Sequence, residues 1–231
     1  MNLIDSLVKD GWLKTPEIIE TLHKVKREDF LADNSKDLAE LNEALPIGSG
    51  QTISQPLTVA FMLELLQPKI GDKILDIGSG SGWTTALLAH IVKGRESFSR
   101  SKNSRPSQKG GVISVEVVPE LKKFGERNVA KYNFLEKGVV KYVLGDGSEG
   151  FLPAGRQVKK NSRNTGIYDK ILVSAAAESL SEARFWKEQL KIGGRLVCVI
   201  KNSIWLFIKN SKNDFEEKEY PGFVFVPLIR K

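Results

Sequence analysis

The stretch Ile74-Leu75-Asp76-Ile77-Gly78-Ser79-Gly80-Ser81-Gly82-Trp83 decides the fold class of this 231-residue chain. Apolar residues around a single acid predict the end of a buried parallel strand. Three glycines at alternate positions follow, and a helical pattern then begins at Thr84. Glycines let the backbone approach a ligand closely, and the amide groups of a helix N-terminus point outward. A strand, a glycine turn and a helix in this order predict a nucleotide site in an open α/β sheet.

The chain after residue 73 alternates strand and helix patterns. We expect strands at 73–78, 111–116, 139–144, 168–176 and 193–200; a helix follows the first, second and fourth of them, and a basic tract follows the third. Repeated strand–helix–strand units form parallel sheets with right-handed crossovers. The tail, at 204–209 and 215–229, has no helix between its apolar runs and predicts an antiparallel pair at the sheet edge. We therefore expect an α/β fold: a doubly wound, mostly parallel, Rossmann-like sheet of seven strands with antiparallel C-terminal strands.

Residues 1–44 precede this domain and carry short helical patterns. Thr15-Pro16-Glu17 is typical of a helix start, and that helix continues to Val25. An earlier helix would present one apolar face made of Leu3, Leu7 and Val8. Because such short helices are marginal in water by themselves, we expect a small helical cap at 1–44 on a main domain at 45–231.

The composition excludes several classes of protein. A hydrophobic content of 41 % and a charged content of 27 % are typical of a soluble globular chain. The longest apolar runs, such as 196–200, fall far short of the ~20 residues of a membrane span, and the N-terminus lacks a signal-peptide pattern. The single cysteine, Cys198, lies in an expected strand, where a buried hydrophobic role is the commonest one. We expect a cytoplasmic monomer without a membrane anchor.

The net charge of +7 comes from two tracts. Residues 95–110 hold five cations and one acid, and residues 155–166 hold four cations and no acid. Both are rich in Ser, Asn, Gln and Gly, which predicts basic loop insertions, and we place the second near the active edge of the sheet. Neither tract alternates aromatic residues with its cations as a single-strand binding groove does, so we do not expect nucleic acid as a partner.

Three acids follow three successive strands and would meet at the carboxyl edge of the sheet. Glu116 could accept hydrogen bonds from both hydroxyls of a ribose. Asp146, before Gly147, is placed to accept from an adenine amine, and Asp76 offers a counter-charge to a cationic tail, directly or through water. The glycine turn has no Lys or Arg for a phosphate, and the chain lacks the GxxxxGK[ST] loop. The pattern predicts an adenosine ligand with a positive or zwitterionic tail, and it resembles class I S-adenosylmethionine-dependent methyltransferases.

The segment Leu45-Pro46-Ile47-Gly48-Ser49-Gly50-Gln51-Thr52-Ile53-Ser54-Gln55-Pro56 has the Pro and Gly content of an ordered, irregular loop. The residue types alone favour Ser54 as the N-cap of a helix at 57–66, with Pro56 in the first turn. The same segment resembles the signature of the protein-L-isoaspartate (D-aspartate) O-methyltransferase family. The resemblance covers most of the chain, including Arg27-x-x-Phe30 and Phe225-Val226-Pro227-Leu228.

This resemblance implies methyl transfer from S-adenosylmethionine to the free carboxylate of L-isoaspartyl residues in damaged proteins or peptides. The methyl ester would then close to a succinimide, and S-adenosylhomocysteine would be the other product. The family's catalytic serine falls on Ser54, a role that is compatible with capping. Together with the three acids, the resemblance gives as candidate cofactor-binding residues Thr52, Ile53, Ser54, Asp76, Gly78, Ser79, Gly80, Gly82, Glu116, Asp146 and Gly147.

The chemistry implied for the acceptor matches what the sequence lacks. A carboxylate has an unperturbed pKa of ~3.9 and is already a nucleophile at neutral pH, so the reaction needs alignment more than a general base. The two histidines, His23 and His90, lie away from the predicted site, and no metal-ligand spacing appears, so we expect no metal.

Four departures from the family pattern leave other functions open, and two of them are the basic insertions at 95–110 and 155–166. Glu40 and Asn42 stand where the family commonly has an aromatic residue and an acid, and Val199-Ile200-Lys201 replaces a Pro-Val-Gly sequence. The alternatives are a methyltransferase that acts on RNA or a small molecule, and a non-catalytic relative that only binds S-adenosylmethionine.

Overall fold

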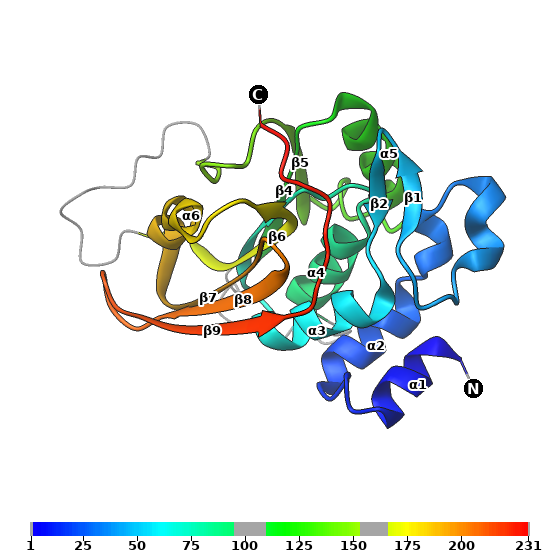
Figure 1. Ribbon diagram of the computed structural model, residues 1–231. Helices are drawn as coiled ribbons and strands as arrows, with labels where there is room; N and C mark the ends of the chain where they lie inside the picture. The colour runs from blue at the N-terminus through cyan, green and yellow to red at the C-terminus, as the bar shows by residue number, and fades with distance from the viewer. Residues whose placement is uncertain (1, 95–109, 153–165, 231) are drawn as a thin grey trace, which may run out of the picture.

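The computed structural model describes residues 2–94, 110–152 and 166–230, and a seven-stranded sheet lies at its centre (Figure 1). The strand order is β5-β4-β3-β6-β7-β8-β9. The strands are β3 (Lys73–Ile77), β4 (Gly111–Glu116), β5 (Val140–Leu144), β6 (Tyr168–Ala177), β7 (Leu190–Ile200), β8 (Ser203–Lys209) and β9 (Phe215–Pro221). Strands β3 to β7 pair in parallel, and β8 and β9 pair antiparallel. The predicted fold class is confirmed.

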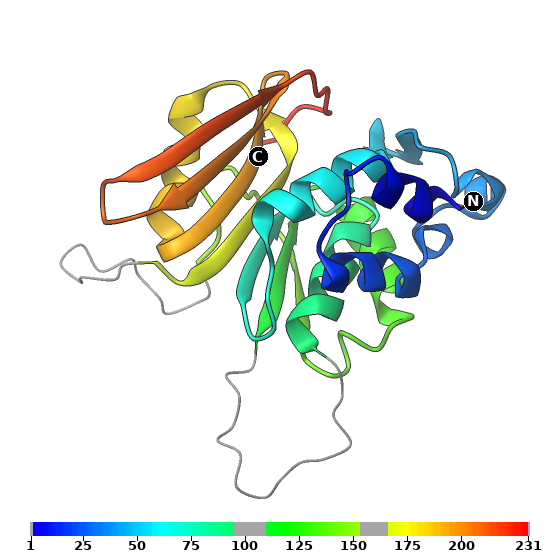
Figure 2. The ribbon, with the colours of Figure 1, turned by 90° about the horizontal axis from the view of Figure 1, so that it is seen from below.

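Helices cover both faces of the sheet, which explains why its central strands are mostly apolar on both faces. Helices α3 (Pro56–Leu66), α4 (Trp83–Lys93) and α5 (Pro119–Ala130) lie on one face of the sheet, and α6 (Ala183–Gln189), which follows the 3-10 turn η3 (Leu180–Glu182), lies on the other (Figure 2). Successive strand residues point to opposite faces, so Ile74 packs in the core under α3 to α5, and Leu75 packs in the core under α6.

The order of strands reverses at β3, which lies between β4 and β6. Open α/β sheets bind ligands at such a switch point, beyond the carboxyl ends of the strands. The glycine turn fills this position: Gly78, Gly80 and Gly82 have φ angles of 74°, 52° and 85°. A Cβ atom on Gly82 would lie 2.6 Å from the Tyr142 hydroxyl, so only glycine fits where the turn packs on the sheet.

The cap consists of α1 (Leu3–Lys9), α2 (Pro16–Lys24) and the 3-10 turns η1 (Arg27–Phe30) and η2 (Asp33–Leu38). Its buried side chains, such as Leu22 and Phe30, belong to the same hydrophobic core as Leu63 and Leu87 of the main domain. Val8 is 38 % exposed although Leu7 is buried, so the predicted shared face was wrong for Val8. Consecutive residues of a helix point about 100° apart, and α1 packs only on the side of Leu7.

The expected irregular loop is instead a β-hairpin. Strand β1 (Leu45–Gly48) pairs antiparallel with β2 (Gln51–Ile53). Ser49 and Gly50 between them both have positive φ, the geometry of a tight hairpin turn whose twist matches its strands. Pro and Gly, which suggested a loop, therefore belong to a short two-stranded ribbon beside the site.

The second expected C-terminal strand ends early, at Pro221. Gly222, with φ of 97°, turns the chain, and residues 222–230 form a C-terminal strap across the end of the sheet (Figure 1). The strap is held to β6 at Ala176, whose N–H donates to Val226 O and whose carbonyl accepts from Leu228 N–H, both at 2.9 Å.

Most of both basic tracts lies outside the described residues, but the residues that flank the second tract are described. The Tyr168 hydroxyl donates to Phe151 O at 2.7 Å, and Ile167 N–H donates to Gln189 O at 2.9 Å. The residues that flank the tract thus lie near the start of β6. This is the end of the parallel strands opposite the glycine turn. Our placement of this insertion near the active edge was wrong for its attachment points, because the chain after Gly147 runs along α6 before the tract begins.

Within the described ranges, no helix has the length and apolar character that crossing a membrane requires.

Candidate functional site

A pocket lies over the carboxyl end of β3, at the switch point of the sheet. Its walls come from the hairpin, the glycine turn, the ends of β4, β5 and β6, and the strap. Eight of the eleven predicted cofactor-binding residues line it: Thr52, Ile53, Ser54, Gly78, Ser79, Gly80, Glu116 and Gly147. Asp76, Gly82 and Asp146 are not among the lining residues.

Glu116 ends β4 and is held against the glycine turn. Its Oε2 accepts from Gly80 N–H at 2.8 Å, and its Oε1 accepts from Val117 and Val118 N–H at 2.9 and 3.0 Å. A carboxylate offers about four acceptor positions, and these bonds use three of them. The predicted contact with both hydroxyls of a ribose therefore requires the Gly80 bond to be shared or released.

Asp76 lies fully buried beneath the turn. Its Oδ2 accepts from the Thr85 and Thr84 hydroxyls at 2.6 and 3.2 Å, which ties β3 to the first turn of α4. Burial raises the pKa of Asp76 to about 6; the threonine bonds lower it and the nearby Glu116 raises it further. A ligand in the pocket would feel the field of Asp76 without touching its side chain.

Asp146 follows β5 and does not itself line the pocket. Its Oδ1 accepts from Ser148 N–H at 2.8 Å, which fixes the turn after β5. The neighbouring Gly145 and Gly147 line the pocket instead. A Cβ atom on Gly147 would lie 2.5 Å from Ile77 Cγ2, so glycine permits this close approach to β3.

Ser54 lies between β2 and α3 and lines the pocket. Its predicted N-cap role was wrong: Gln55 is the N-cap residue of α3, and no side chain of that residue caps the helix. An N-cap side chain would accept a hydrogen bond from a backbone N–H in the first turn of α3. Here Leu57 N–H donates instead to Asn42 Oδ1 at 3.0 Å, and Asn42 precedes it by 15 residues in the sequence. The Ser54 side chain is therefore not used in capping.

The departure from the family pattern at Glu40 and Asn42 is accounted for by contacts with α1 and α3. Asn42 binds the start of α3, as described, and Glu40 Oε2 accepts from Leu3 N–H at 3.0 Å, at the start of α1. Neither residue lines the pocket. Glu40 thus fixes the start of α1, and Asn42 fixes the start of α3.

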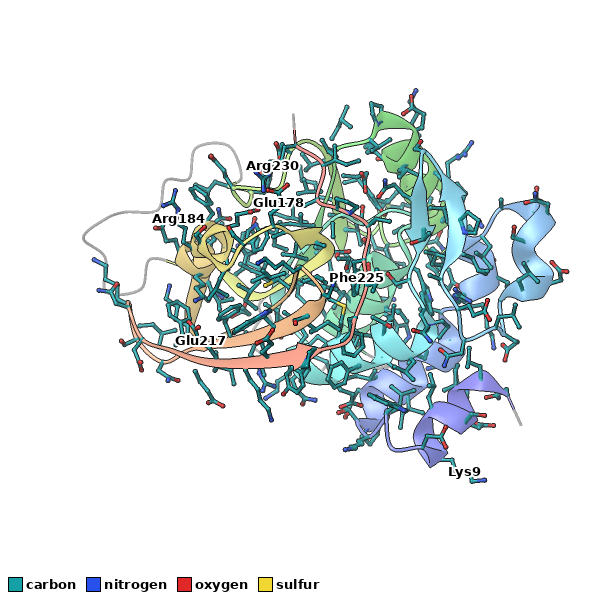
Figure 3. All side chains as sticks on the ribbon, in the orientation of Figure 1. Lys9, Glu178, Arg184, Glu217, Phe225 and Arg230 are labelled. Carbon is teal, nitrogen blue, oxygen red and sulfur yellow. The ribbon has the colours of Figure 1, made fainter. Side chains whose placement is uncertain are left out.

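Sequence reasoning missed part of the wall. Trp83, Ser174 and the strap residues Val226 to Ile229 line the pocket. The end of the strap is fixed by an ion pair between Arg230 and Glu182 of η3, and Figure 3 labels Arg230 and Phe225 along its path. No local pattern marks a segment that returns over the strand ends; only the match of residues 225–228 to a family motif pointed to it.

The lining residues fit an adenosine ligand with a zwitterionic tail. Trp83 and Ser174 line the pocket, and the buried atoms Trp83 Nε1 and Ser174 Oγ make no hydrogen bond to the described residues. Ile77, Val117 and Leu121 supply apolar surface, and Glu116 supplies the acceptor. Among the described residues, no Lys or Arg lines the pocket.

Neither histidine belongs to the pocket. The Thr21 hydroxyl, which donates to Glu17 O, lies 2.9 Å from His90 Nδ1, so that nitrogen donates and links α4 to the cap. His23 lies 3.8 Å from Asp5 on the surface of the cap. In the part of the chain that the structure describes, no three His, Cys, Asp or Glu residues come together as a metal site.

Comparison with known proteins agrees with this geometry. The family model of protein-L-isoaspartate (D-aspartate) O-methyltransferase matches residues 1–231. The chain belongs to this family. It is 35 % identical to a protein-L-isoaspartate O-methyltransferase of Methanopyrus kandleri, over 98 % of this chain and 89 % of the relative. A relative of the same name from Pyrococcus horikoshii is 36 % identical, over 98 % of this chain and 90 % of its own length.

Solved structures of the family share the fold. A Plasmodium falciparum protein-L-isoaspartate O-methyltransferase, crystallised with S-adenosyl-L-homocysteine, superposes with a TM-score of 0.78 over 100 % of both chains, at 22 % identity. A second structure of a protein-L-isoaspartate O-methyltransferase gives a TM-score of 0.74 over 97 % of this chain and 64 % of that one, at 24 % identity. At these identities the likeness establishes the fold, including the arrangement of the sheet.

Proposed function

We propose that this chain methylates the free carboxylate of L-isoaspartyl residues in damaged proteins and peptides, with S-adenosylmethionine as methyl donor. The observation that carries the proposal is the position of Ser54. The hairpin brings it into the same pocket as the glycine turn and Glu116, so the signature of the family and the predicted nucleotide site share one cavity. Full-length relatives at about a third identity carry this activity in their names.

The residues that would hold S-adenosylmethionine are those of the turn and its neighbours. Glu116 would accept from ribose hydroxyls, the apolar wall would pack against the adenine, and the amides of the turn would face the amino-acid tail. When bound, this cofactor supplies a methyl group on a positively charged sulfur, which a carboxylate oxygen can attack without losing a proton first.

Ser54 would orient the acceptor. Its hydroxyl can donate one hydrogen bond to a carboxylate oxygen, which fixes the other oxygen toward the methyl group. No histidine of the described chain lines the pocket, which suits an acceptor that is ionised at neutral pH. The strap closes one side of the pocket and limits the access of water to the reacting groups.

We further propose that the enzyme acts as a monomer in the cytoplasm, on isoaspartyl proteins as its partners. Cys198, the one cysteine, is fully buried, and burial strongly raises the pKa of its thiol, which favours a reduced, buried thiol over a disulfide.

The product of the reaction tests the proposal. An isoaspartyl peptide would be incubated with the protein and S-adenosylmethionine and followed by liquid chromatography with mass spectrometry. We expect a methyl ester first, then a succinimide, and then a mixture that contains the normal aspartyl peptide. Methylation of RNA or of a small molecule in place of the peptide would support the alternative acceptors, and cofactor binding without any methylated product would support a non-catalytic relative.

A further inference from the structure

Arg27 of η1 is a buried cation, 7 % exposed, that no family role of the site explains. Its guanidinium donates to the carbonyls of Ala39, Leu41, Glu43 and Ser54, at 3.1, 2.9, 2.7 and 3.4 Å. An arginine whose charge is satisfied by backbone dipoles of two separate segments can fix both segments relative to each other.

The same guanidinium reaches the wall of the pocket. Its central carbon lies 5.5 Å from the centre of the Trp83 ring, and that ring lines the pocket while Arg27 does not. Burial lowers the pKa of Arg27 to about 10 and the nearby Glu40 opposes this, so the side chain stays charged at neutral pH. The cation therefore contacts one lining side chain and the backbone of another, Ser54.

A second route leads from Arg27 to Ser54 through Asn42. The guanidinium holds the carbonyls on both sides of Asn42, at Leu41 and Glu43. The Asn42 carbonyl in turn accepts from Gln55 Nε2 at 2.8 Å, and its side chain accepts from Leu57 N–H. Residues on the C-terminal side of Ser54 are thus fixed by a segment that Arg27 itself fixes.

We propose that Arg27 is the positioning residue of the proposed catalytic serine: it acts through the Ser54 backbone, the 39–43 segment and the Trp83 ring to aim the Ser54 hydroxyl into the pocket. The inference rests on the proposed function. The planar fork of the guanidinium is required, because the single nitrogen of a lysine cannot span four carbonyls on two segments and stack on a ring. Displacement of a reacting group by about 1 Å can cost about 100-fold in rate.

The test uses Arg27→Lys, Arg27→Met and a matched control, Lys209→Met. Lys209 is also a buried cation, 2 % exposed, that donates to two backbone carbonyls, Lys187 O and Leu190 O, at the opposite edge of the sheet. Lys209→Met should therefore lower the stability of the protein without changing the position of Ser54. The Lys variant of Arg27 keeps the charge and keeps the test valid if the Met variant does not fold.

Hydrogen exchange of the protein without ligands is the first readout, and it does not depend on the reaction. We expect faster exchange of the amides in 39–43 and 51–57 in the Arg27 variants than in wild type, and no such change in the Lys209 variant. Unchanged exchange of these amides in both Arg27 variants would overturn the proposal, whatever the activity of the protein proves to be.

A double-mutant cycle with Ser54→Ala is the second readout. Arg27→Lys should lower kcat about tenfold or more and change the affinity for S-adenosylhomocysteine by less than about threefold. The double variant should be about as slow as Ser54→Ala alone, because the two residues act through one hydroxyl. Effects that multiply would show that Arg27 does not act through Ser54 and would contradict the inference. A wild-type protein with no methyl transfer would instead refute the proposed function and leave the exchange result standing.

Discussion

The hydroxyl of Ser54 is the residue-scale feature on which the proposed reaction depends. If it orients the acceptor carboxylate, Ser54→Ala should lower kcat for an isoaspartyl peptide by roughly 100-fold, the order of loss expected when a reacting group is no longer aligned. The affinity for S-adenosylhomocysteine, measured by calorimetry, should change little because Glu116 and the glycine turn remain. Thr21→Ala provides a control hydroxyl, since Thr21 donates to Glu17 O within α2, away from the pocket. An equal loss of kcat in both variants would contradict the assigned role.

Asp76 predicts a pH dependence of stability. Its pKa of about 6 in the folded protein exceeds that of an unfolded chain, near ~3.9, so the folded state holds the proton more tightly. The contribution of Asp76 to stability is therefore greatest at low pH and falls as the pH rises from about 4 to about 6. Two pKa units correspond to about 3 kcal/mol. Denaturant unfolding of wild type and Asp76→Asn should diverge by this order across that window, and a pH-independent difference would refute the prediction.

At the scale of elements, the sheet could be predicted from sequence because strands buried on both faces are continuous apolar runs between helical patterns. The elements around the pocket could not. The hairpin contains Pro46 and a turn with two positive φ angles, which locally indicate a loop. The start of α3 is capped from Asn42, 15 residues away, and the strap depends on pairing with Ala176. These contacts join residues far apart in the sequence, so no local pattern encodes them.

The strap is anchored at its first turn by an aromatic cluster. Phe61 of α3 stacks on Phe223 at 5.4 Å and meets Tyr220 edge-on at 5.1 Å, measured between ring centres. Phe61→Ala should reduce stability by roughly 2 kcal/mol, because the ring is only partly buried, and should speed hydrogen exchange of residues 222–229. Since four strap residues line the pocket, the affinity for S-adenosylhomocysteine should fall as well.

Phe215→Ala is the matched control for the strap. Phe215 starts β9 at the far end, where its ring lies beside Lys187 and Lys209. The Phe215→Ala variant should be less stable than wild type, but hydrogen exchange of the strap amides should not change. If strap exchange rises equally in both variants, the aromatic cluster is not the anchor.

At the scale of the whole molecule, the cap at 1–44 and the domain at 45–231 share one hydrophobic core. We therefore propose that residues 1–44 and 45–231 fold as one cooperative unit, although the sequence pattern changes between them. Thermal unfolding followed by circular dichroism should show one transition, and amides of α2 should exchange with the same free energy of opening as those of β3. Separate transitions, or a cap that opens at much lower free energy, would contradict this.

The positive charge of the basic tracts does not change the acceptor that we expect, which is a carboxylate. The described attachment points of the second basic tract lie at the edge of the sheet opposite the pocket, so the tract is not anchored beside the acceptor. The pocket itself is built around hydrogen-bond donors, one fixed carboxylate and apolar walls, which suits a cofactor and a small carboxylate. Recognition of damage would then come from the position of the acceptor carboxylate on its peptide.

The central claim is tested most directly by the rate of labelled methyl transfer to two peptides that differ only in one linkage. One peptide carries an L-isoaspartyl residue and the other carries normal aspartate at the same position, and both are assayed with one preparation that binds S-adenosylhomocysteine. The account predicts transfer to the isoaspartyl peptide and none above background to the aspartyl peptide. Equal labelling of the two peptides, or no labelling of either, would contradict it.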